Sequence, residues 1–133
     1  MGQWVSNNWN NADEYDCSGT PWCETVTLSD SAVTKITFPT VTRWIQVVNN
    51  NQTATNTALV GFTENGVNSN PTNSYYFVVS GKASSGRLEL RCTHLFLKAG
   101  AGTPSVSVIA GVTQIPHKNM FVLTGSNNIS GVG

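Results

Sequence analysis

The chain has 133 residues, a formal net charge of zero and only 11% charged side chains, about half the usual share. This length corresponds to one domain with a sizeable core. The lack of a basic excess argues against nucleic-acid binding, and no run of 18 apolar residues predicts a membrane span. The abundance of Asn, Ser, Thr and Gly suits either an extracellular domain or a protein whose surface is largely covered by other subunits.

The charge is unevenly placed along the chain. The first 30 residues contain five acidic side chains and no Lys or Arg, whereas the rest contains all seven basic residues and two Glu. Opposite charges attract over short distances in water. We therefore expect the acidic segment to meet the basic remainder, in its own chain or in a neighbouring copy.

Residues 1–24 are predicted to form an irregular N-terminal arm. They show neither helical nor strand periodicity, yet they carry large aromatic side chains among Asn and Asp residues. Because such rings are costly to leave in water, we expect them to anchor the arm on its own domain or on an adjacent subunit. The candidate interface residues are Trp4, Trp9, Tyr15 and Trp22.

Residues 25–124 are predicted to form a β-sandwich, and residues 125–133 a flexible C-terminal tail. Short alternating runs separated by turn residues indicate eight to ten strands and no convincing helix. The predicted strands are 25–28, 32–38, 41–48, 57–63, 75–79, 87–97, 105–109, 112–115 and 120–124. The sequence lacks the Cys…Trp…Cys spacing typical of an immunoglobulin-like sandwich. The expected fold is therefore all-β, a single jelly roll of about eight antiparallel strands.

The middle of this domain is predicted to be an antiparallel hairpin. Two β-rich runs, 75–79 and 87–92, flank a polar connection with glycine at each end, which suits a chain reversal. The apolar phase slips after Cys92, so residues 93–94 hold either a bulge or a boundary between two strands. The side chains expected mostly inside are Trp44, Ile45 or Val47, Leu59, Phe62, Phe77, Val79, Leu88, Leu90, Phe96, Val108 and Phe121.

Three cysteines form no even disulfide framework, and the N-terminus lacks the features of a secretory signal, so we expect synthesis in a reducing cytoplasm. Cys17 and Cys23, with His94 and His117, offer the ligand types of a zinc site, but not the spacing of a zinc ribbon or finger. A local disulfide is another alternative; we favour two unconnected thiols and no metal. Cys92 is expected to be a small core residue.

No motif indicates catalysis. The sequence has no Gly-x-Ser-x-Gly elbow and no glycine loop that opens a helix, and its clustered carboxylates lie in the arm. We therefore expect no enzyme activity, no catalytic residues and no cofactor. Gly2 matches an acylation pattern, and Asn51 and Asn128 begin glycosylation triplets, but neither pattern has supporting context.

Five segments between residues 43 and 115 carry a family resemblance. They are RWIQVVN (43–49), VGFTENGV (60–67), YFVVSG (76–81), LELRC (88–92) and SVIAGVT (107–113). In order and spacing they resemble the single-jelly-roll penton proteins of large icosahedral DNA viruses, whose major capsid proteins are double jelly rolls. No counterpart of residues 1–24 is identified in that family.

The resemblance implies a structural role without catalytic residues. Five copies would form a homopentamer at each vertex of the capsid, in contact with neighbouring major and minor capsid proteins. It places the protein in the virion, after assembly in the host cytoplasm, with no nucleic acid and no direct membrane span.

The alternative function is that of a jelly-roll ligand- or carbohydrate-binding module, such as a receptor-binding head or a lectin-like domain. A sugar site would normally combine exposed aromatic rings with carboxylates. The arm aromatics, beside Asp13 and Asp16, offer that combination.

Overall fold

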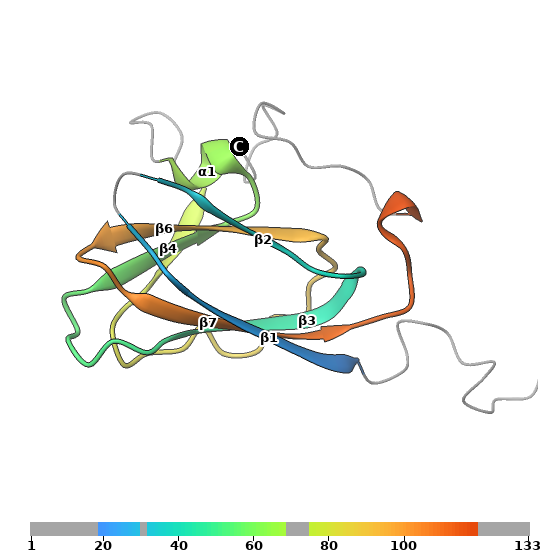
Figure 1. Ribbon diagram of the computed structural model, residues 1–133, viewed down its shortest axis with the longest axis horizontal. Helices are drawn as coiled ribbons and strands as arrows, with labels where there is room; N and C mark the ends of the chain where they lie inside the picture. The colour runs from blue at the N-terminus through green and yellow to red at the C-terminus, as the bar shows by residue number, and fades with distance from the viewer. Residues whose placement is uncertain (1–18, 30–31, 69–74, 120–133) are drawn as a thin grey trace, which may run out of the picture.

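The computed structural model describes residues 19–29, 32–68 and 75–119. Within these residues the chain forms seven strands, one short helix and one 3-10 turn. Figure 1 shows the strands stacked in two layers. The elements are β1 (Thr20–Thr27), β2 (Thr34–Thr37), β3 (Thr42–Asn49), β4 (Thr57–Gly61), α1 (Glu64–Val67), β5 (Tyr76–Val79), β6 (His94–Ala101), β7 (Ser105–Val112) and η1 (His117–Asn119).

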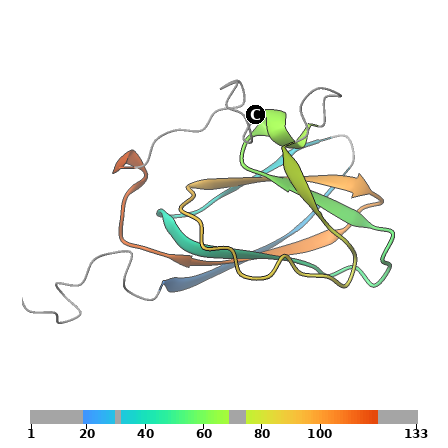
Figure 2. The same cartoon turned by 180° about the vertical axis from the view of Figure 1, so that it is seen from behind.

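The strand order is that of a jelly roll. Sheet A has the order β1-β7-β3 and sheet B the order β2-β6-β4-β5, and all pairs are antiparallel. Residues 83–91 run beside β3 through the bridges Ile45–Leu88 and Val48–Ser84, in the place of a fourth strand of sheet A (Figure 2). Successive strands thus cross between the sheets, except β4 and β5, which is the wrapping of a jelly roll. The predicted fold class is confirmed.

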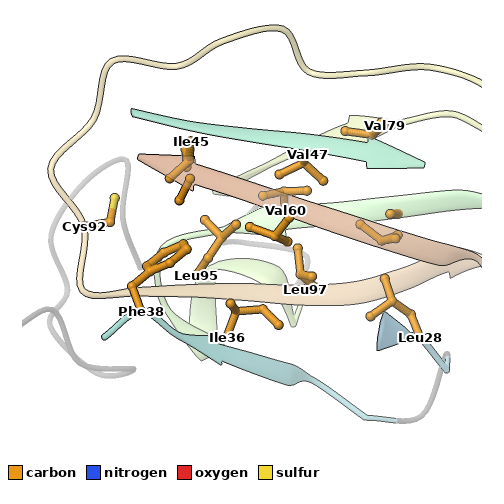
Figure 3. Close-up of a cluster of buried hydrophobic side chains, with 14 of the residues drawn as sticks. Leu28, Ile36, Phe38, Ile45, Val47, Val60, Val79, Cys92, Leu95 and Leu97 are labelled. Atoms are coloured by element: carbon orange, nitrogen blue, oxygen red, sulfur yellow. The ribbon is translucent and has the colours of Figure 1, made fainter. Parts of the chain in front are cut away.

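The core lies between the two sheets, and strand alternation builds it. Every second residue of β7 and of β6 is buried, as their apolar alternation predicts. Figure 3 shows Phe38, Leu95 and Leu97 converging with side chains from the opposite sheet. The largest fully buried side chains are Phe38, Leu28, Ile36, Ile45, Leu95, Leu97, Val41, Val47, Val60, Val67, Val106 and Val108.

The predicted core list is confirmed in part. Its buried members are Ile45, Val47, Leu59, Val79 and Val108. Its half-buried members are Trp44, Phe62, Phe77, Leu88, Leu90 and Phe96. Phe121 lies outside the described residues. The prediction overweighted aromatic size: several large rings lie on the rim or the outer face, whereas the centre is filled by aliphatic side chains.

The predicted hairpin is wrong. β5 pairs with β4 in sheet B, whereas residues 83–91 run beside β3 in sheet A. Its glycine-bounded connection does turn the chain, but it carries the chain from one sheet to the other. Turn residues specify a change of direction and not the strand that lies alongside, so local sequence alone did not distinguish the two outcomes.

Several predicted boundaries also change. The predicted arm ends at residue 24, but β1 begins at Thr20, because residues 20–24 pair with β7. The phase slip after Cys92 is a strand boundary, since β6 begins at His94. The predicted break at Gly111 is absent, and β7 runs through it. The predicted strand 120–124 and tail 125–133 lie outside the described residues.

A short helix, α1, lies between the predicted strands 57–63 and 75–79. Thr63 caps it: the Thr63 hydroxyl accepts a hydrogen bond from Gly66 N at 3.0 Å. The helix covers the outer face of sheet B, where Val67 is fully buried against Gly61. A β-carbon at Gly61 would lie 2.6 Å from Val67 Cγ1, so the close approach requires glycine.

Candidate functional site

Of the four predicted interface residues, only Trp22 lies in the described part of the chain; Trp4, Trp9 and Tyr15 lie outside it. Trp22 is half-buried in β1, and its ring meets that of Phe38 edge to face at 5.1 Å between centroids. Aromatic pairs prefer this arrangement. Trp22 therefore anchors β1 on the chain's own core.

The outer face of sheet A carries a second tryptophan, Trp44, which sequence reasoning placed in the core. Its indole lies against Gly111 on the neighbouring strand, where a β-carbon would come within 2.3 Å of Trp44 Nε1. The Arg87 guanidinium lies over the ring, 5.5 Å from its centroid, and pairs with Glu89 at 2.7 Å. The Trp44 ring therefore packs on the Gly111 backbone and contacts the Arg87 guanidinium, a cation–π arrangement that is favourable.

Uncharged polar side chains cover much of the same face. Gln46 Nε2 donates to Ser84 Oγ at 2.8 Å, and Asn50 Nδ2 donates to Ser107 Oγ at 2.7 Å. The Ser107 hydroxyl also shares a 2.8 Å hydrogen bond with Thr25. These bonds tie β1, β7, β3 and the 83–91 segment together across the sheet, leaving amides and hydroxyls at the surface.

Two histidines predicted as possible zinc ligands come together at one end of the sandwich. The rings of His94 and His117 are 5.6 Å apart, and His117 Nε2 donates to the Phe38 carbonyl at 2.6 Å. Burial, and then the nearby charges of Lys35 and His117, lower the pKa of His94 below its usual value. The hydrogen bond from His117 to Phe38 links the chain after β7 to the residue that follows β2.

A zinc site is not assembled in the described part of the chain, where no three His, Cys, Asp or Glu side chains gather as metal ligands would. Cys17, half of the predicted Cys17–Cys23 pair, lies outside the described residues. Cys23 is an exposed free thiol on β1. Cys92 is buried between the sheets, which confirms its prediction as a core residue (Figure 3).

The two described thiols are expected to react very differently. Burial raises the pKa of Cys92 to about 11, although a hydrogen bond with Thr42 partly opposes this. At pH 8 about one Cys92 thiol in a thousand is then ionised, and the thiolate is the reactive form. Iodoacetamide should label Cys23 in the native chain, and Cys92 only after unfolding, as peptide mass spectrometry would show. Rapid native labelling of Cys92 would contradict its burial.

The same pKa shift makes stability depend on alkaline pH. Between about pH 9 and 11 the unfolded chain loses the Cys92 proton while the folded chain keeps it. Unfolding is therefore favoured progressively as the pH rises through this window. A Cys92→Ala variant should lack this contribution in urea unfolding experiments, although it is less stable at neutral pH.

The described fold is a single jelly roll in which sheet A has a polar outer face. Comparisons with protein-family models, with curated proteins and with solved structures found no match. Among the described residues, no helix is both long enough and apolar enough to cross a bilayer.

Proposed function

We propose that this chain is a structural capsid protein that forms the pentameric vertex of an icosahedral virus particle. The observation that carries the proposal is the strand order, β1-β7-β3 followed by residues 83–91 in one sheet and β2-β6-β4-β5 in the other. Capsid proteins are a major user of this double Greek-key arrangement. Because a fold alone does not define a function, the proposal also uses the family resemblance of the sequence.

The resembling segments support the proposal by their distribution in the fold. Residues 43–49 and 107–113 cover most of the neighbouring strands β3 and β7, and residues 88–92 include part of the segment beside β3. Residues 60–67 and 76–81 contain the end of β4, all of α1 and all of β5. The likeness therefore includes strands of both sheets, although no resembling segment lies in β1, β2 or β6.

The alternative, a carbohydrate-binding module, draws support from the outer face of sheet A. Trp44 lies there among amides and hydroxyls. Sugars stack on aromatic rings and form hydrogen bonds with amides and hydroxyls. Arg87, however, lies over the indole ring, so a stacked sugar would have to displace the guanidinium. This competition makes the capsid role the better supported proposal.

Purified full-length chain should assemble into rings of five. Native mass spectrometry would then give five times the 14.2 kDa chain mass, and negative-stain images would show five-fold rings. Glycan-array binding by the same preparation tests the alternative, with Trp44→Ala as its variant and Phe96→Ala, another half-buried ring on sheet B, as the control. A chain that remains monomeric and binds glycans in a Trp44-dependent manner would contradict the capsid role.

A further inference from the structure

Sheet A ends in two edges that lie far apart in the fold. β1 is one outermost strand. The other edge is the 83–91 segment beside β3 together with Lys82 in the turn just before it, and is called the 82–91 edge. Figure 1 shows β1 in front in the lower layer, and Figure 2, from behind, shows the connection from β5 to β6 running along the same layer. Neither edge has a further strand beside it in the described part of the chain.

The edge of β1 has backbone groups oriented away from its own sheet. Leu28 N donates to Pro104 O at 2.9 Å, which continues the ladder between β1 and β7. Since alternate residues of an antiparallel strand bond to the same neighbour, the N–H and C=O groups of Cys23, Thr25 and Thr27 point away from β7. Such an edge favours pairing or close contact with another chain.

The opposite edge is less regular, because residues 83–91 meet β3 through isolated bridges and not as a continuous strand. Ile45 and Leu88 exchange two backbone hydrogen bonds, of 2.9 and 2.8 Å, which turns the Leu88 groups toward β3. The backbone groups of the preceding Arg87 therefore point away from the sheet. Glu89 lies in a tight turn in which Leu90 N donates to Leu88 O at 3.0 Å. Both edges thus offer backbone and side-chain contacts to a neighbour.

The two edges differ in charge. β1 carries one charged side chain, the exposed Glu24, and no basic residue. The other edge carries three exposed basic residues, Lys82, Arg87 and Arg91, against one acid, Glu89. Arg87 and Glu89 pair with each other, and Arg91 has an interaction of its own. The excess of basic groups nevertheless leaves a positive potential along this edge.

We propose that the β1 edge of one copy contacts the 82–91 edge of the next copy. Such a head-to-tail contact brings opposite charges together, whereas a two-fold contact between two β1 edges would bring Glu24 against its own counterpart. A contact between two different surfaces repeats around an axis and closes into a ring if the rotation permits. The inference rests on the proposed capsid role and names the contact that joins neighbouring copies.

Charge reversal on each edge of the full chain tests this contact. One variant is Glu24→Lys, and the other combines Lys82→Glu with Arg87→Glu. In sedimentation velocity at about 50 mM salt, each should weaken self-association about tenfold, because like charges then face each other across the contact. The variant with all three changes should associate at least threefold more tightly than either, because its edges are again opposite in charge.

Matched controls separate this contact from general electrostatics. Lys35→Glu with Lys98→Glu makes the same change in net charge on β2 and β6 of sheet B, and should leave association within about twofold of the native chain. Lys82→Glu alone tests the basic edge without disturbing Arg87 on Trp44, and should show a smaller loss in the same direction. At about 1 M salt, where the screening length is about 3 Å, the differences should shrink.

The outcomes distinguish the contact from the capsid role. Five-membered rings that are indifferent to the edge variants would overturn the contact and leave the capsid role standing. Edge-dependent assemblies of another size would support the contact and overturn the pentameric vertex. A native chain that is monomeric at every concentration would overturn the contact. Thermal unfolding of each variant shows whether the comparison is between folded chains. Little change is expected at the exposed Glu24 and Lys82, and a small loss at Arg87, which contacts Trp44 and Glu89.

Discussion

Replacing Phe38 with alanine is expected to lower the free energy of unfolding by about 3–5 kcal/mol, the usual range for a buried phenylalanine. Phe38 is fully buried and has the largest volume among the fully buried side chains of the described residues. Its ring also supports Trp22, whose edge-to-face contact would be lost. The remaining cavity would lie between the sheets, where the surrounding strands are too rigid to fill it.

Urea unfolding followed by circular dichroism measures this loss. Val78→Ala is the matched control: Val78 is 51% exposed on β5, so its truncation should cost less than about 0.5 kcal/mol. A loss for Phe38→Ala near that of the control would contradict the placement of the Phe38 ring in the core.

Asn49→Ala is expected to lower the free energy of unfolding by about 2–4 kcal/mol, because it leaves several backbone groups without partners. Asn49 is a polar side chain only 1% exposed. Its amide donates to Val79 O at 3.0 Å and Asn56 O at 2.9 Å, and its Oδ1 accepts from Asn51 N at 3.0 Å. One side chain thus connects β3 of sheet A to β5 of sheet B and holds the loop between β3 and β4.

The neighbouring Asn50 provides the control. It is exposed and donates to Ser107 on the surface, so Asn50→Ala should cost less than about 1 kcal/mol. Asn49→Asp should be at least as damaging as Asn49→Ala, because a carboxylate would face two carbonyl oxygens. Equal stability of the Asn49 and Asn50 variants, measured by urea unfolding, would show that the link between the sheets contributes little.

These two residues also bear on the proposed role. A capsid subunit must keep its edges at a constant distance from one another when it contacts several neighbours. Phe38, which follows β2, fills space between the sheets. Asn49, the last residue of β3, joins the sheets by hydrogen bonds. Both therefore help to position the two edges of sheet A on which the proposed head-to-tail contact depends.

The sequence by itself determined the β class and the position of most strands. In β7, the alternation of SVSV placed Val108 inside, as observed, and Val106 lies on the same buried face. Such patterns are local, because a strand with one buried face alternates whatever its partner is. The burial of Cys92 followed from the same alternation. The concentration of aromatic rings before residue 25 was also legible, although only Trp22 lies in the described residues.

Only the tertiary structure decided which segments lie side by side. β5 and residues 83–91 are adjacent in sequence but belong to different sheets, because strand pairing depends on contacts far away in the chain. Trp44 lies on the outer face because Gly111, 67 positions later, leaves room for its indole there. The contrast between an acidic β1 edge and a basic 82–91 edge likewise arises only when β7 and β3 separate them in one sheet. Composition showed the unequal charges, and the strand order set Glu24 and the basic residues of the 82–91 edge at opposite ends of sheet A.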